Sequence, residues 1–176
     1  MKQKAPSPNA LRVADLPQNA PTFFAVRPET SRRQAIAEDM ELIALRKLSF
    51  EGKVEAEGAD DWRLTARLGA TVTQPCAVTL DPVTTRIDED VTRHYQRDFI
   101  VVDAPEAEMP EDETAEQLTA WIDPEAVMLE ALALALPLYP RAPDAELGEM
   151  TVTAPGVAPM RDEDAKPFAA LAELKD

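Results

Sequence analysis

Two stretches in the middle of the chain place apolar side chains at every second position, with polar or charged side chains between them. They cover residues 47–58 and 62–68, and a period of two is typical of a strand that buries one face. Residues 58–61, Gly-Ala-Asp-Asp, favour a tight turn between them. We therefore predict a hairpin, with a bend or bulge near Gly52. The apolar positions are Leu48, Phe50, Val54, Ala56, Trp62, Leu64, Ala66 and Leu68.

Three further strands are expected around this hairpin. The longest runs from Val83 or Thr84 to Phe99, and two short ones cover residues 11–16 and 22–27. Prolines follow both short strands and would end them. The long strand has one face that is less polar than the other, and we expect that face to be buried although it carries charge. It consists of Thr85, Ile87, Glu89, Val91, Arg93 and Tyr95.

A helix is predicted for residues 31–42. Ser31 and Gln34 have the spacing of a capping box, in which each side chain satisfies a backbone N–H group of the first turn. Apolar side chains follow at helical intervals. A second, shorter helical pattern returns near the end of the chain at residues 167–175, where three apolar side chains align on one face.

The most apolar helix is predicted directly after Asp123. This residue suits the N-cap, Pro124 suits the first helical position, and Pro137 ends the helix after Leu136. Glu130 is the single charge after the first turn, and a helix this apolar belongs in the core against a sheet. Together these patterns predict an α+β fold, in which an antiparallel, twisted, barrel-like sheet of long strands is packed by the apolar helix.

The chain length of 176 residues fits one domain, which we place at residues 10–140. A proline-rich acidic tail follows at 141–176. Within the domain we expect an acidic loop at 103–120, because residues 103–116 carry seven acidic side chains, two prolines and no basic residue. Two interpretations of this loop stay open, a solvated linker and a docking site for a basic partner.

Charge is the strongest bulk constraint on the partners of this protein. The chain has 33 acidic and 18 basic residues and a formal net charge of −15. Because a nucleic-acid-binding surface must offset phosphate charge, any contact with RNA has to be local. A basic protein, in contrast, would be attracted to the molecule as a whole.

Few residues in the chain can carry chemistry. One cysteine and one histidine exclude an intramolecular disulfide and leave too few ligands for a zinc site. The glycines lack the spacing of a nucleotide-binding loop, and no Gly-x-Ser-x-Gly motif is present. Cys76 has no sequence neighbour that would lower its thiol pKa, so we interpret it and His94 as structural. We expect no cofactor, no metal and no enzymatic activity; a hydrolase that uses Cys76 or the acidic groups is the least favoured interpretation.

The sequence also predicts a location in the cell. Residues 1–9 contain two lysines but no apolar segment of a secretory signal. The longest apolar run on the predicted core helix, residues 131–136, is much shorter than the roughly 20 residues that span a membrane. We therefore expect a cytoplasmic protein without membrane contact.

Charged residues supply two candidates for binding. Glu130 lies in an apolar helix, so its carboxylate needs a partner, either an arginine of the sheet such as Arg63, Arg67 or Arg86, or a basic ligand. The alternation of side chains along a strand places the arginines of the strands on both faces of the sheet. They form one basic strip if a bulge brings them to the same face, and this strip is the candidate contact for a phosphate backbone. Its members are Arg63, Arg67, Arg86, Arg93 and Arg97.

Two short motifs stand out, one after the predicted hairpin and one in the apolar helix. Their residues are Cys76, Leu80, Asp81, Pro82, Val83, Glu130, Leu136 and Pro137. With the order of the predicted elements, they resemble the YceD-like family of bacterial and plastid proteins associated with accumulation of large-subunit ribosomal RNA. The resemblance covers about residues 10–175. Val78 and Thr79 stand where many relatives have arginine and cysteine, so a shared function does not depend on a cysteine cluster.

The resemblance implies a non-enzymatic factor that supports maturation or accumulation of large-subunit ribosomal RNA, in a family often encoded beside a small basic large-subunit ribosomal protein. It implies no catalytic residues. Because the chain is acidic, we expect it to bind such a basic protein, or the large-subunit precursor that contains it, more readily than naked RNA. The alternative is a direct RNA-binding module that uses the arginine strip.

Overall fold

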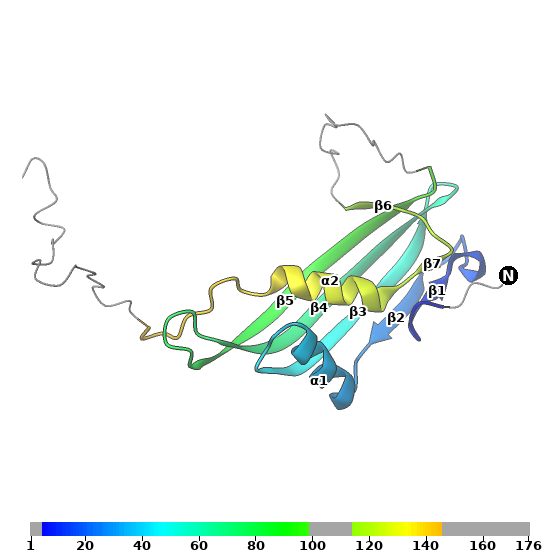
Figure 1. The fold of residues 1–176 in the computed structure, drawn as a ribbon. Helices are drawn as coiled ribbons and strands as arrows, with labels where there is room; N and C mark the ends of the chain where they lie inside the picture. The colour runs from blue at the N-terminus through cyan, green and yellow to red at the C-terminus, as the bar shows by residue number, and fades with distance from the viewer. Residues whose placement is uncertain (1–4, 99–113, 146–176) are drawn as a thin grey trace, which may run out of the picture. The chain divides into compact units, whose positions relative to one another are not determined.

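The computed structural model describes residues 5–98 and 114–145 of the chain. Residues 1–142 and 143–176 form two separate units, and all elements named below belong to the first. The helix predicted at 167–175 lies outside the described residues. The elements are β1 (Leu11–Arg12), the 3-10 helix η1 (Val13–Asp15), β2 (Thr22–Val26), α1 (Thr30–Asp39), β3 (Ala44–Glu57), β4 (Asp61–Pro75), β5 (Pro82–Gln96), β6 (Ala115–Gln117), β7 (Trp121–Ile122) and α2 (Pro124–Ala135) (Figure 1).

The predicted hairpin is the centre of the main sheet. β3 pairs antiparallel with β4, and β4 pairs antiparallel with β5. Phe50 and Leu64 are fully buried on one face, as predicted, because alternate side chains of a strand point to opposite sides of the sheet. The buried side chains of β5 also lie on the expected face; they include Ile87, Val91 and Tyr95. We call this side of the sheet the covered face and the opposite side the open face.

β3 contains a bulge, but not at the predicted position near Gly52. The pairing of β3 with β4 continues through Gly52 and shifts between Leu45 and Lys47. Leu45 and Leu48 are both buried, so the extra residue leaves Arg46 and Lys47 exposed next to each other. The spacing of three between the two leucines, followed by a spacing of two, is the sequence signal of this bulge.

The main sheet has the order β2-β3-β4-β5-β6, and in the described part of the chain it is open. The prediction of a barrel-like sheet is therefore wrong, while the α+β class and the mostly antiparallel pairing are confirmed. β6 pairs in parallel with the end of β5. It falls within the acidic loop predicted at 103–120, so that prediction is wrong for Ala115–Gln117, whose backbone extends the sheet edge. Residues 103–113 lie outside the described residues.

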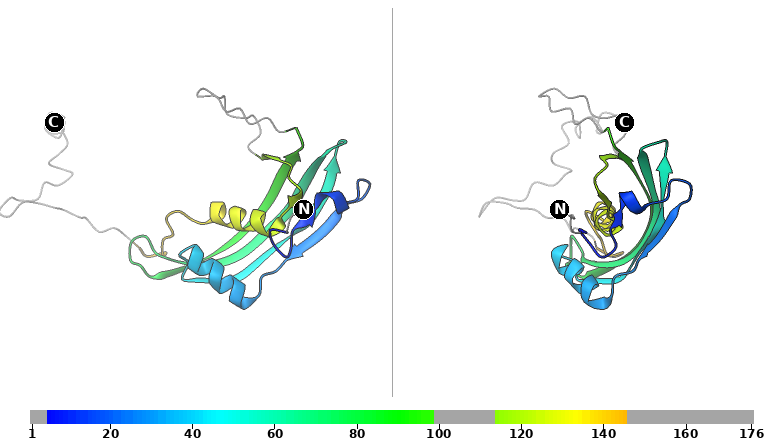
Figure 2. Two further views of the ribbon diagram at one scale, coloured as in Figure 1. Left: turned by 45° about the vertical axis from the view of Figure 1, so that its right-hand side comes forward. Right: turned by 90° about the vertical axis from the view of Figure 1, so that its right-hand side faces the viewer.

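α2 lies against the covered face, and the sheet curves around it (Figure 2). The helix contacts β2, β3, β4 and β5. The carboxylate of Asp123 accepts the N–H of Glu125 at 3.0 Å, which confirms the predicted N-cap. Packing against the sheet is also confirmed, but only on one side of the helix. Met128 and Leu132 are 0% exposed, whereas Leu134 is 75% exposed.

The N-terminal elements pack onto the main sheet. α1 is close to the predicted helix at 31–42, and its buried Ile36 and Ala37 lie on the side that contacts β3. The strand predicted at residues 11–16 is shorter, because η1 follows β1 directly. β1 pairs antiparallel with β7 in a separate two-stranded sheet. This pairing fixes the segment that leads into α2.

Candidate functional site

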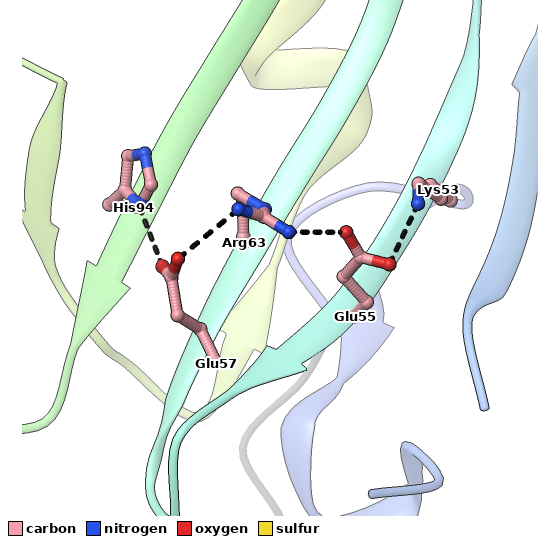
Figure 3. Close-up of polar contacts among 5 residues, drawn as sticks. All are labelled: Lys53, Glu55, Glu57, Arg63 and His94. Carbon is pink, nitrogen blue, oxygen red and sulfur yellow. Dashed lines mark hydrogen bonds and ion pairs between the residues drawn. The ribbon is translucent and has the colours of Figure 1, made fainter. Parts of the chain in front are cut away.

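The open face of the main sheet carries a row of alternating charges. Lys53 Nζ lies 2.7 Å from Glu55 Oε2, and Arg63 Nη2 donates to Glu55 Oε1 at 2.8 Å. Arg63 Nη1 lies 3.3 Å from Glu57 Oε1, and Glu57 Oε2 lies 2.6 Å from His94 Nδ1. This charge ladder of five side chains connects β3, β4 and β5 (Figure 3).

Glu55 and Arg63 stabilise each other's charged forms. Hydrogen bonds from Lys53 and then from Arg63 lower the pKa of Glu55, and the bond to Glu55 raises the pKa of Arg63. Because the whole ladder is accessible to solvent, its pairs contribute little to the stability of the fold. The charge ladder instead affects binding, because the Arg63 guanidinium already contacts two carboxylates and is poorly available to a phosphate.

The predicted arginine strip is divided between the two faces of the sheet. Arg93 points to the covered face, because the pairing of β4 with β5 continues without the bulge that would turn it over. Arg97 follows the end of β5 and forms an ion pair with Asp60 at 2.7 Å. The arginines of the strip that share the open face are Arg63, Arg67 and Arg86.

A groove of about 580 Å³ gathers cations at one end of the open face, where the end of β2 and α1 approach β3, β4 and β5. The strand register places Lys47 opposite Thr71, and Thr71 opposite Arg86, in one row across the sheet. None of the described residues that line the groove is acidic. We call it the basic groove, and its cations are Arg27, Arg33, Arg46, Lys47 and Arg86.

The cations of the basic groove differ in how far they are already neutralised. Arg27 forms an ion pair with Glu51 at 2.7 Å, and Arg86 forms one with Asp88 at 2.6 Å. The second pair lowers the pKa of Asp88 and raises that of Arg86. Arg46 and Lys47, at the bulge, form no ion pair or side-chain hydrogen bond with any described residue.

Only one residue of the basic groove, Arg86, is a binding candidate that the sequence predicts. The others come from segments that are distant along the chain, and only the sheet order brings them together. One local signal was available. Arg46 and Lys47 lie between two buried leucines, at a spacing that a regular strand cannot bury on one face. That dipeptide marks both the bulge and the centre of the groove.

A second pocket, of about 490 Å³, is lined by residues of β5, β6, β7 and α2. We call it the acidic pocket, because Glu116, Asp123 and Glu130 supply its charges and Tyr95 and Trp121 its aromatic surface. The indole Nε1 of Trp121 is buried and finds no hydrogen-bond partner among the described residues. Carboxylates beside aromatic rings form a suitable environment for a cationic side chain.

Arg93 holds two carboxylates at the acidic pocket. Its Nε lies 3.1 Å from Glu116 Oε1, and its Nη2 lies 3.1 Å from Glu130 Oε1. The expectation that an arginine of the sheet pairs with Glu130 is confirmed, although it is none of the three named from the sequence. Burial, and then repulsion from Glu130, raise the pKa of Glu116 in spite of Arg93. The pocket has three carboxylates against this one arginine, so negative charge is in excess there.

The two motifs noted in the sequence meet at one corner of the fold. The Gln74 side-chain amide donates to the carbonyl of Pro137 at 3.2 Å. The backbone N–H of Ala77 donates to the carbonyl of Pro140 at 2.8 Å. Segments that are widely separated along the chain, the turn after β4 and the turn after α2, are therefore tied together. The two separated motifs therefore lie at the same contact, which holds the end of α2 against the end of β4.

Cys76 is at the centre of this corner and is fully buried. Its Sγ accepts the N–H groups of Val78, Thr79 and, from the segment that follows α2, Ala142, each at 3.4 Å. The hydrogen bond from the Thr79 hydroxyl, followed by those from the backbone amides, lowers the thiol pKa to about 6. The sequence-based expectation of an unaltered thiol is therefore wrong, because donors in a turn are not visible as charged neighbours.

The contribution of Cys76 to stability is expected to depend on pH. Below about pH 6 the sulfur is protonated in the folded and the unfolded chain, so the lowered pKa adds nothing. Between about pH 6 and its ordinary pKa of 9.0, only the folded chain releases the proton, and the free energy of unfolding rises with pH. Above that range the gain is constant.

Urea unfolding of the unaltered protein and of Cys76→Ser, from about pH 5 to about pH 10, measures this effect. Serine does not titrate in this range, so the difference between the two proteins isolates the thiol. The poorer packing of the variant adds an offset that does not change with pH. A difference in stability that stays level across the window would contradict the lowered pKa.

The two remaining residues that could take part in catalysis, His94 and Cys76, are not brought together. His94 lies opposite Arg63 near the start of β4, whereas Cys76 follows the end of that long strand. Within residues 5–98 and 114–145, no three histidine, cysteine or carboxylate side chains are grouped so that they could hold a metal ion. In the same residues, no helix combines the length and the apolar character needed to cross a membrane.

Comparison with known proteins places the chain in a family. Residues 64–175, from within β4 past the end of α2, match the family described as Large ribosomal RNA subunit accumulation protein YceD. The protein belongs to this family, and the resemblance inferred from its motifs is confirmed. The family's description names a role in the accumulation of ribosomal RNA and no enzymatic reaction. Among curated proteins and among solved structures, no match was found.

Proposed function

We propose that this protein is a non-enzymatic factor in the accumulation of large-subunit ribosomal RNA, and that it acts by binding a basic ribosomal protein or the pre-ribosomal particle that contains it. Membership of the YceD family supports the first part. The acidic pocket is the observation that carries the second. A factor of this kind would keep a basic protein from non-specific contacts until its place on the RNA is ready.

The charge of the chain suits such a partner. With a formal net charge of −15, the protein attracts basic proteins at long range and accelerates their encounter. Attraction alone gives no specificity, because salt at physiological concentration screens interactions between exposed charges beyond roughly 8 Å. A defined pocket is needed to hold a particular side chain, and the acidic pocket supplies one.

A lysine or arginine side chain of the partner would find two kinds of contact in the acidic pocket. Glu116 and Glu130 offer carboxylate oxygens, and the single guanidinium of Arg93 is shared between them. The rings of Tyr95 and Trp121 offer aromatic surface for a cation. A basic side chain that binds here would therefore lower the pKa of Glu116 again.

The alternative function, direct RNA binding through the arginine strip, has weaker support. Arg63 is held by two carboxylates of the charge ladder, and Arg97 is paired with Asp60. Arg93 is only 14% exposed and lies on the covered face with its own acidic partners. Of the strip, Arg67 alone keeps an exposed guanidinium without an ion pair to a described residue.

Affinity capture from a lysate of the native host tests the proposal. The tagged full-length chain is compared with Glu116→Gln/Glu130→Gln, which keeps hydrogen-bond acceptors for Arg93 but removes the negative charges. We expect the unaltered chain to retain a basic ribosomal protein after RNase treatment, and the double variant to retain about tenfold less. The matched control, Glu38→Gln/Asp39→Asn, removes two exposed acids of α1 and should retain the same amount.

The outcomes of this experiment are distinct. Loss of the captured protein on RNase treatment would contradict binding through protein contacts. Equal losses in both double variants would show that net charge, rather than the acidic pocket, is responsible. Capture without any ribosomal component, in all samples, would contradict the function as a whole.

A further inference from the structure

The basic groove is a charged site that the acidic pocket does not explain. It is formed by β3, β4 and β5 together with the end of β2 and α1, and five cations line it. We propose that the basic groove binds the phosphate groups of a single-stranded segment of RNA. It shares only Arg86 with the arginine strip considered from the sequence. The inference goes beyond the proposed function, because this contact requires no ribosomal protein.

The bulge in β3 makes the centre of the groove. In a regular strand, Arg46 and Lys47 would point to opposite faces, and one of them would face the core. The shift of register between Leu45 and Lys47 lets two leucines occupy the covered face and leaves both cations exposed. Neither cation has an ion pair with another described residue, so both keep their hydrogen-bond donors for a ligand.

Hydroxyl groups of β3 and β4 add further donors to the groove, beside the Arg86 guanidinium that Asp88 already holds. Arg86 Nη1 lies 3.4 Å from Thr71 Oγ1, and both residues stand in the same cross-strand row as Lys47. The hydroxyl of Ser49 also lines the groove. Guanidinium groups bind phosphate oxygens through parallel N–H bonds, and hydroxyl groups complete such contacts. The arrangement therefore suits the oxygen atoms of a phosphodiester.

The groove stays positive although the protein is strongly acidic. Of its five cations, Arg27 and Arg86 are paired with Glu51 and Asp88, so three cations remain without an acidic partner among the described residues. Other surface charges act over roughly 8 Å at physiological salt and are largely screened beyond that distance. The net charge of −15 therefore weakens binding of RNA but does not cancel it at this place.

Three further observations favour RNA over a free phosphate ion. Phe23 of β2 lies on the same open face, opposite Lys53, and is 76% exposed. Phe23 is outside the groove lining but lies four residues before Arg27, which belongs to it, and exposed aromatic rings near cations are a means by which proteins stack unpaired bases. The family description, in addition, concerns ribosomal RNA. A groove of about 580 Å³ is also larger than one phosphate group requires.

Fluorescence anisotropy with a labelled single-stranded RNA oligonucleotide tests this site on the purified full-length chain. The variant Arg46→Glu/Lys47→Glu is expected to bind the RNA at least about tenfold more weakly. The slope of log affinity against log salt should fall by about 0.7 for each phosphate that the variant no longer binds. Arg46→Gln/Lys47→Gln removes the charges without reversing them and should weaken binding by a smaller factor.

The matched control is Arg12→Glu/Arg141→Glu, which changes the net charge equally at two exposed arginines outside both the groove and the arginine strip. It should bind RNA within about threefold of the unaltered chain. Equally weakened binding in the two glutamate variants, or no RNA affinity in the unaltered chain, would overturn the proposal. Displacement of the RNA by polyglutamate at equal charge concentration would overturn the assignment to RNA. The purified assay contains no ribosomal protein, so its result is independent of affinity capture.

Discussion

Replacing Leu132 with alanine is expected to lower the free energy of unfolding by about 2–5 kcal/mol. Leu132 is 0% exposed and belongs to the main core cluster between α2 and the sheet. Its branched end would leave a cavity that the long, paired strands opposite cannot close, so the cost of this cavity adds to the transfer free energy of the removed atoms. Because domains of this size unfold with about 5–15 kcal/mol, the variant would lose a large share of its stability.

Leu134→Ala is the matched control for this prediction. It removes the same atoms from the same helix, but Leu134 is 75% exposed. Its cost should stay within about 0.5 kcal/mol. Urea unfolding followed by circular dichroism measures both variants, and equal costs would contradict the packing of α2 described above. Comparing the two variants also tests which side of this almost entirely apolar helix is buried. The sequence pattern alone does not predict that side.

The parts of the fold that could be predicted are those with a strict local period. The alternation from Trp62 to Leu68 placed every buried side chain of that stretch correctly, because one face of β4 packs against the core and the other is exposed to solvent. The start of α2 could be predicted for a similar reason. A carboxylate followed by proline has one favoured conformation, and Asp123 adopts it.

The parts that could not be predicted depend on partners far away in the chain. β6 has only three residues, and two of them are polar, so nothing in its own pattern indicates that it would pair in parallel with β5. The open edge of the sheet has the same origin. Long strands alone do not decide whether a sheet closes, because closure depends on the pairing of its outermost strands.

The candidate site shows the same division. The need of Glu130 for an arginine could be predicted from its apolar surroundings, but the choice of Arg93 depended on the face of β5. The arginine strip failed as one surface because strand parity separates Arg93 from Arg67 and Arg86. The basic groove was missed because its cations come from β2, α1, β3 and β5, and only the sheet order unites them.

The two proposed sites together resolve a conflict in the composition. A chain with a net charge of −15 is a poor ligand for RNA and a good one for basic proteins. Placing the acidic pocket beside α2 and the basic groove on the open face lets one small domain present both signs of charge. Under the two proposals, the protein would bring a basic partner and an RNA segment together, and each interaction can be abolished without the other.

A second large effect is expected at Gly52, whose replacement by alanine should cost about 3 kcal/mol, the upper end of the range for overpacking. A Cβ atom at this position would meet the carbonyl oxygen of Thr65 and would lie 2.5 Å from the Cβ and 2.6 Å from the Cα of Ala66. Two of these three atoms belong to the backbone of β4. They can move only if β3 separates from β4, which would break the central pairing of the sheet.

Gly69→Ala separates this crowding from a general effect of glycine in a strand. A Cβ atom at Gly69 would lie 2.8 Å from Arg86 Nη2 and 3.1 Å from Ser49 Oγ, both at the ends of side chains that can rotate away. Its cost should therefore stay below about 1 kcal/mol, since alanine also restricts the unfolded chain. Neither glycine has a positive φ angle, so neither variant is strained by a left-handed backbone. If urea unfolding gave the same cost for both, the close approach of β3 and β4 at Gly52 would be wrong.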